Sequence, residues 1–130
     1  MIKYIFHIPI YECDVMLMQI ESKQDSDIVM KNLDWLKVDN EDKQDYKAKI
    51  ERGCVNGGDC WRNYSLHKFL ISFFPFTNMN KKKEVYSHEK RHLEDRILEF
   101  AEVNDIEAAG YLSGFLGKKF YKFEQLQNNK

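Results

Sequence analysis

The segment from Phe69 to Phe74 constrains the fold of this chain most strongly. Its residues, Phe-Leu-Ile-Ser-Phe-Phe, are almost continuously apolar, and Pro75 ends the run. Such a run is typical of a strand whose two faces are both covered, because exposure of either face would leave large apolar side chains in water. The sequence therefore predicts a buried strand within a small sheet.

Alternating and apolar segments predict two β-hairpins, one formed by residues 2–10 and 13–20, the other by residues 61–64 and 66–74. In the first hairpin, Pro9 cannot donate a hydrogen bond to a partner strand, so the turn is expected near residues 10–12. The second hairpin contains the buried strand. The sheet is therefore expected to combine an N-terminal hairpin with a hairpin from the middle of the chain.

Helical spacing of apolar residues predicts two short helices over residues 25–52, followed by helices over residues 84–100 and 106–120. Asp39-Asn40 divides the first pair, and Asn104-Asp105 divides the second. The tail, residues 125–130, is expected to fray. Together with the hairpins, these helices predict a single α+β domain over residues 1–130.

Composition excludes several classes of partner. The chain has 20 basic and 21 acidic residues, and its dense basic run, Lys81-Lys82-Lys83, is followed directly by Glu84. Binding to nucleic acid is therefore not expected, because it depends on clustered positive charge. No apolar run approaches the roughly 20 residues that span a bilayer, so no membrane association is expected.

Three cysteines are an odd number, which argues against a disulfide framework and favours the cytoplasm.

The residues His88-Glu89-Lys90-Arg91-His92 lie in the helix predicted over residues 84–100. Side chains four residues apart on a helix share one face, about 6 Å apart along the axis. His88 and His92 can therefore offer two imidazole nitrogens to one metal ion, while Glu89 lies beside them, free to take a proton from a water molecule. This pattern predicts a zinc site in which Glu89 is the general base.

A catalytic zinc ion needs a third protein ligand, and Glu107 is the leading candidate because it opens the next predicted helix. It reaches the histidines only if the preceding helix ends near residues 97–101 and the chain doubles back, since a helix rises about 1.5 Å per residue. Asp105 and Glu102 are alternative ligands, and Glu107 can also be a plain surface carboxylate. Tyr111 shares a face with Glu107 and is a candidate hydrogen-bond donor to an oxyanion, with packing as its other role.

Two further interpretations of the sequence are considered, one for the motif helix and one for the cysteines. Residues 87–92 are polar throughout, so this helix face can simply be solvated and carry ordinary ion pairs. Cys54, Cys60 and His67 can be imagined as a second zinc site. Their spacing matches no standard zinc module, however, and free thiols are more common.

The motif His88-Glu89-Lys90-Arg91-His92, with Glu107-Ala108-Ala109-Gly110-Tyr111 after it, resembles the gluzincin branch of zincin-like metallopeptidases. In outline the chain is similar to very small zincin-like proteins of phages and mobile elements, which combine an N-terminal β-hairpin, a small sheet with an edge strand, the HExxH helix and a short closing helix. The resemblance implies that zinc is bound by His88, His92 and Glu107, with Glu89 as the general base. It also implies that the strand carrying Phe69, Ile71 and Phe73 is an edge that aligns an extended peptide.

These features favour a compact zinc metallopeptidase in a zincin-like domain, with Zn²⁺ as cofactor and a peptide or protein as substrate. One alternative is a non-catalytic zincin-like protein of a phage or mobile element, which holds a metal ion or binds a host protein. A weaker alternative is a small domain in which the histidines are incidental.

Overall fold

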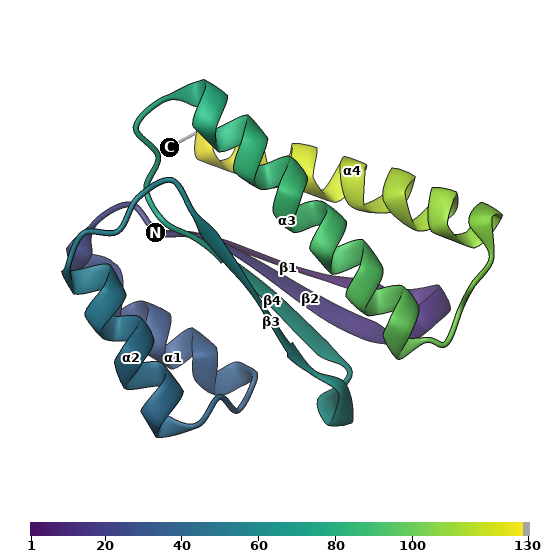
Figure 1. The fold of residues 1–130 in the computed structure, drawn as a ribbon, viewed down its shortest axis with the longest axis horizontal. Coiled ribbons are helices and arrows are strands. Elements are labelled where there is room, and N and C mark those ends of the chain that lie inside the picture. Colours follow the sequence, from purple (N-terminus) through teal and green to yellow (C-terminus); the bar gives the residue numbers. More distant parts are fainter. Residues whose placement is uncertain (129–130) are drawn as a thin grey trace.

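The computed structural model describes residues 1–128, and Figure 1 shows two pairs of helices on opposite sides of one sheet. The strands are β1 (Ile2–Ile8), β2 (Cys13–Gln19), β3 (Gly58–Asn63) and β4 (Lys68–Phe73). The helices are α1 (Ser26–Trp35), α2 (Asn40–Glu51), α3 (Met79–Phe100) and α4 (Ile106–Asn128), with short 3-10 turns at Pro9–Tyr11, Lys23–Asp25 and Tyr64–Leu66. Within the described residues the fold is therefore α+β, as the sequence predicts.

The sheet has four strands in the order β1-β2-β4-β3. β1 pairs antiparallel with β2, and β3 pairs antiparallel with β4, so both predicted hairpins are confirmed. The hairpins meet where β2 runs parallel to β4, and the connection between these two strands passes through α1, α2 and β3. β4 thus has partners on both sides as well as helices over both faces, which explains its continuously apolar sequence.

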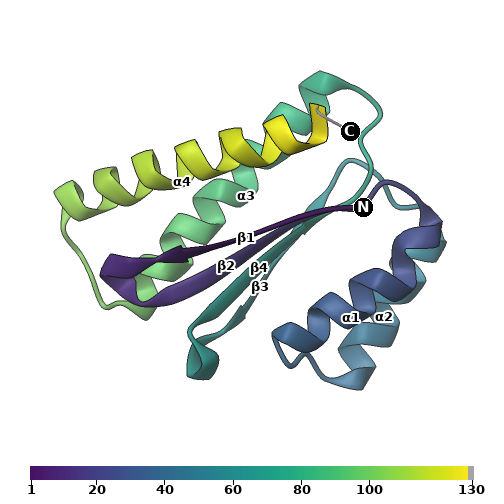
Figure 2. The same ribbon diagram turned by 180° about the vertical axis from the view of Figure 1, so that it is seen from behind.

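Successive side chains of a strand point to opposite faces, so the strands of this sheet contribute side chains to two separate cores. On one face, apolar side chains of the strands pack against α3 and α4; they include Val15, Leu17, Phe69, Ile71 and Phe73. On the other face, Met16, Met18 and Leu70 pack against α1 and α2. Figure 2, which views the sheet from behind, shows the same three layers. α3 is held on the sheet by the first of these cores.

The helix ends differ from the predicted ones for local reasons. α3 begins at Met79, before the predicted Glu84, because the side chain of Asn78 accepts a hydrogen bond from the backbone N–H of Lys81 at 2.9 Å and caps the helix. α4 continues beyond Phe120 to Asn128, since its buried stripe extends to Phe123. Residues 125–128, which the sequence predicts to fray, are part of this helix, and residues 129–130 lie outside the described part of the chain.

The cysteines and the helices bear on two expectations that were drawn from composition. All three cysteines are free thiols. Within residues 1–128, none of the helices combines the length and the apolar character that a membrane crossing requires.

Candidate metal centre

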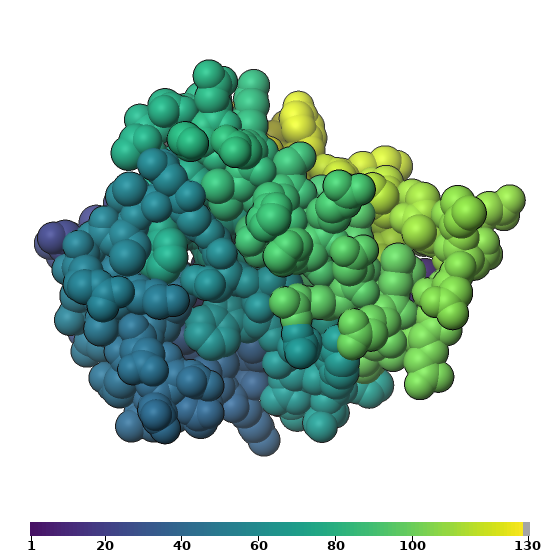
Figure 3. Space-filling view, viewed as in Figure 1, coloured from purple at the N-terminus to yellow at the C-terminus, as the bar shows by residue number. Residues whose placement is uncertain are grey.

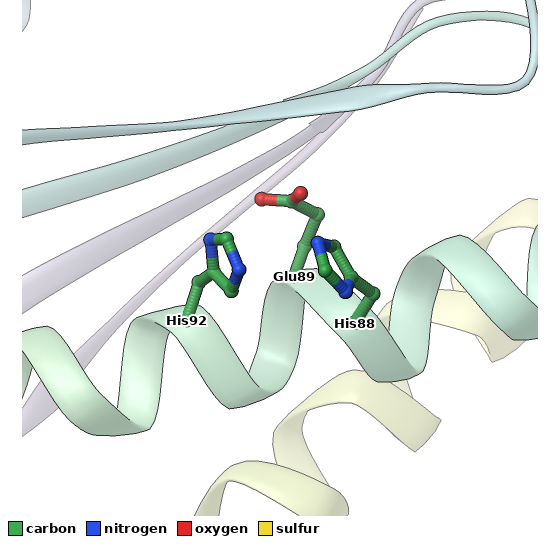
Figure 4. A group of neighbouring side chains, drawn as sticks. All are labelled: His88, Glu89 and His92. Atoms are coloured by element: carbon green, nitrogen blue, oxygen red, sulfur yellow. The ribbon is translucent and has the colours of Figure 1, made fainter.

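One face of α3 packs on the sheet, and the HExxH motif begins on the border of that face. The buried residues of α3 are Tyr86, Glu89, Leu93 and Ile97, spaced three or four apart as on one side of a helix. Glu89 is the charged member of this otherwise largely apolar stripe. Its place in the stripe directs its carboxylate toward the strands rather than toward solvent, as Figure 4 shows.

His88 and His92 lie on the flank of α3 beside Glu89. Their ring centroids are 4.3 Å apart. One donor atom from each of His88, Glu89 and His92 lies within 4.8 Å of the other two, and we call these three residues the metal-ligand group. His88 is exposed and His92 is half-buried, so the group opens to solvent on one side. The predicted helical turn therefore does bring two imidazoles and a carboxylate together.

Glu89 is unusual because it is a buried carboxylate with a free oxygen. Its side chain is 6% exposed, and its Oε2 atom has no hydrogen-bond partner among residues 1–128. Leaving a buried polar atom unpaired costs about 1–3 kcal/mol. Burial raises the pKa of Glu89, an effect that nearby His92 and His88 oppose and nearby Asp59 reinforces. Such a group is typical of functional sites, where a proton or a cation supplies the missing partner.

Gly58 lets β3 approach Glu89 closely. A Cβ atom built on Gly58 would lie 3.0 Å from Cδ1 of Phe73 and 3.1 Å from Cγ of Glu89. It would also lie 3.3 Å from the carbonyl oxygen of Ser72. A larger residue at this position would therefore press on the Glu89 side chain from the side of β3.

We expect Gly58→Ala to destabilise the protein by about 0.5–2 kcal/mol. Overpacking costs about 1–3 kcal/mol, and the smaller entropy of the unfolded alanine chain offsets about 0.4–1 kcal/mol of it. Urea denaturation measures the free energy of unfolding. The matched control is Gly114→Ala in α4, where an added Cβ meets nothing within 4 Å and the change is expected to stabilise. Equal stability of the two variants would show that β3 does not press on Glu89.

The motif's Lys90 shows which way the histidines point. Its Nζ donates hydrogen bonds to Glu94 at 2.5 Å and to Ser113 Oγ of α4 at 3.1 Å, so Lys90 faces α4. Residues two apart on a helix point about 200° apart. His88 and His92 therefore point away from α4, toward the side of α3 where β3 lies.

The structure does not bring Glu107 together with the histidines. α3 ends at Phe100 and the chain doubles back, as the prediction required, but α4 then packs on the opposite flank of α3. Glu107 is exposed, in the first turn of α4, about 9 Å along that helix from Ser113 at 1.5 Å per residue. Within the described chain, the metal-ligand group contains Glu89 and not Glu107.

The other residues predicted near Glu107 also lie apart from the group. Asp105 accepts a hydrogen bond from the backbone N–H of Glu107 at 3.0 Å, which occupies it in the turn before α4. Glu102 is an exposed residue in the left-handed conformation. Tyr111 is 59% exposed on α4, the helix from which the histidines point away. Neither Asp105 nor Glu102 belongs to the metal-ligand group in the described chain.

The edge strand beside the motif is β3, not the strand that the resemblance implies. Phe69, Ile71 and Phe73 belong to β4, which is hydrogen-bonded to β2 and to β3, and their side chains are fully buried. β3 closes the sheet on this side, and residues 1–128 provide no further strand to pair with its outer edge. Figure 3 shows the teal segment around β3 at the surface between α2 and α3.

The cysteines and His67 do not form a second site. Cys54 packs with the core under α1 and α2, whereas Cys60 packs with the core under α3 and α4. His67 lies at the turn before β4, where its Nδ1 is 3.1 Å from the carbonyl oxygen of Glu12. The sequence did not identify Gly58 or Cys60 as neighbours of the motif, because residues 54–59 have the composition of a turn and the predicted strand began only at residue 61, whereas β3 begins at Gly58.

Comparisons with models of known protein families, with curated proteins and with solved structures find no match for this chain. The geometry of the metal-ligand group is therefore the basis on which its function is inferred.

Proposed function

We propose that this protein is a zinc-dependent peptidase in which His88 and His92 bind the metal ion and Glu89 is the general base. The main support is the buried Oε2 atom of Glu89, which lacks a hydrogen-bond partner in residues 1–128 and lies beside two imidazoles. Buried polar atoms are nearly always hydrogen-bonded to protein or to water, and no residue of the described chain bonds this oxygen. A role toward a water molecule or a cation accounts for the free oxygen.

The donors of the metal-ligand group fit zinc. Imidazole nitrogen and carboxylate oxygen are both zinc ligands, and each binds at about 2.0–2.2 Å. Donors that surround one ion therefore lie within about 4 Å of one another, close to the 4.8 Å limit that encloses the three donors here. A bound zinc ion supplies Lewis-acid chemistry, because it polarises a carbonyl group and lowers the pKa of water.

Glu89 is placed to move the proton of an attacking water molecule. Its Oε2 atom is free to accept that proton, and the same carboxyl group can then donate it to the leaving amine. Burial raises the pKa of Glu89, and this brings its basicity closer to neutral pH. A general base works best when its pKa lies near the working pH.

An extended peptide is the substrate class that the neighbouring surface fits. The outer edge of β3 lies next to α3 and, within the described residues, pairs with no other strand. A strand edge offers a row of unpaired N–H and C=O groups, to which an extended peptide can add by backbone hydrogen bonds. Such a peptide would pass beside the flank of α3 that carries His88 and His92.

Removal of the metal tests this proposal. We expect the purified protein to hold one equivalent of zinc by elemental analysis and to cleave unstructured peptides. A chelator should abolish cleavage, and added zinc should restore it.

His92→Ala should weaken zinc binding more than roughly a hundredfold, because even partners outside the ligand shell contribute 10–100-fold. The control is His7→Ala, which changes an exposed histidine on β1. Absence of stoichiometric zinc, or its retention in His92→Ala, would refute the proposal.

A second candidate is a metal-holding protein without turnover. It is favoured by one observation, that a Glu89 oxygen lies within 4.8 Å of donors from both histidines and can therefore act as a third ligand. In that case Glu89→Gln should weaken zinc binding itself, and neither form should cleave peptides. A peptidase predicts the opposite, with zinc retained and cleavage lost.

A further inference from the structure

The proposed zinc site has two imidazole ligands from α3 and needs one more protein ligand. Catalytic zinc sites commonly have three protein ligands and one open position. Glu107 lies across α3 from the histidines, and a Glu89 that served as a ligand would lose its free oxygen as a base. The remaining side of the site is formed by β3, which contacts α3 directly.

Cys60 is the β3 residue with a metal-binding side chain that faces α3. Alternate residues of a strand share a face. Gly58 faces Glu89, so Cys60 and Arg62 face the same way. In agreement with this, Cys60 packs with the core formed by the sheet, α3 and α4, whereas its neighbour Trp61 packs with the core on the opposite face.

Cys60 lies at the level of His92 along α3. β3 and α3 run in the same direction, since Gly58 lies against Glu89 and, further along, the ring of Tyr64 is 5.5 Å from that of Phe100. Two strand residues span about 6.6 Å, which equals roughly four residues of helix. The step from Gly58 to Cys60 therefore corresponds to the step from Glu89 to the turn that contains His92.

We propose that the thiolate of Cys60, on the strand that faces this flank of α3, is the third zinc ligand and joins the two histidine nitrogens. This inference rests on the proposed zinc site. Cys60 lies outside the 4.8 Å group, so its side chain must rotate toward the histidines when the metal binds. As the zinc–sulfur bond forms, the thiol releases its proton to solvent. The fourth position stays open, and Glu89 remains free as a base.

The charges around Cys60 favour a cation between it and Glu89. Burial raises the pKa of Cys60 to about 12, the charge of Glu89 contributes to the rise, and Arg62 opposes it. A divalent cation bound beside these residues would offset the negative charge of Glu89 and favour loss of the thiol proton. A water molecule at the open fourth position would supply the partner that Glu89 Oε2 lacks among the described residues. Thiolate and imidazole together form a ligand set that zinc prefers.

Cobalt substitution tests the inference independently of activity. The metal-free protein is titrated with Co²⁺, whose bond to a thiolate produces a sulfur-to-metal charge-transfer absorption in the near ultraviolet. We expect this absorption in the wild type and in the control Cys54→Ser, and we expect its loss in Cys60→Ser. Zinc affinity in Cys60→Ser should fall more than roughly a hundredfold, since removing a group outside the ligand shell already costs 10–100-fold.

Alkylation of the unmodified chain provides a second measurement in case Cys60→Ser does not fold. Zinc should protect Cys60 from iodoacetamide, as read by peptide mass spectrometry, and should leave Cys54 unprotected. Cobalt that binds through His88 and His92 without the absorption, with unchanged zinc affinity in Cys60→Ser, would overturn the role of Cys60 and leave the zinc site intact. A wild type that binds neither metal would overturn both proposals.

Discussion

Glu89→Gln is expected to lower kcat for peptide cleavage by about 10²–10⁴-fold, the usual contribution of a general base. The amide is nearly isosteric with the carboxyl group but cannot take up a proton from water. Because His88 and His92 are unchanged, zinc content by elemental analysis should stay at the wild-type level. Cleavage of a fluorogenic peptide measures the loss.

The matched control for this variant is Glu94→Gln on the same helix. Glu94 pairs with Lys90 at 2.5 Å, on the α4 side of α3 and away from the histidines. Loss of such a pair costs little, about 0.3–0.5 kcal/mol, so cleavage should remain close to the wild-type rate. Full activity in Glu89→Gln would remove Glu89 from the mechanism, and loss of its zinc would favour the metal-holding alternative.

Phe73→Ala is expected to reduce the free energy of unfolding by about 3–5 kcal/mol, the range for a buried phenylalanine. Phe73 is fully buried at the end of β4. Its ring centroid lies 4.2 Å from that of Tyr86 in α3 and 6.3 Å from that of Phe123 in α4. Loss of this ring removes one of the contacts that hold both helices on the sheet. Urea denaturation of the metal-free protein measures the change.

An exposed aromatic residue serves as the comparison for Phe73. Tyr121 of α4 is 66% exposed, and Tyr121→Ala should change the stability by no more than about 0.5 kcal/mol. A change below about 1 kcal/mol in Phe73→Ala would mean that α3 and α4 are held on the sheet mainly by other contacts.

The sequence predicted the elements well because each depends on a local pattern. Period-two alternation and the apolar run 69–74 identified both hairpins, and helical spacing identified the helices. The pairing of His88 with His92 follows in the same way, since four residues make about one helical turn. The parallel pairing of β2 with β4 could not be obtained so, because these strands are separated by two helices and a strand.

The position of the edge strand is a feature that the sequence analysis predicted wrongly. The resemblance implied that β4 is the edge, but its continuous apolar character favours a central strand with both faces covered, and that is where the structure places it. β3, with Asp59 and Arg62 among its residues, has the mixed composition that an edge strand tolerates. The composition of β3 and β4 is thus consistent with their positions in the sheet, although strand order itself depends on long-range packing.

By itself, the sequence determined that two imidazoles and a carboxylate share one region of a helix, because the angles between residues of a helix are constant. Only the tertiary structure decided what lies opposite them. Once Lys90 faces α4, the histidines must point away from Glu107 and toward β3. The direction of the histidines therefore depends on which flank of α3 is covered by α4. The apolar stripe of α4 determines that flank, because its Phe120 and Phe123 pack with Tyr86 in the shared core.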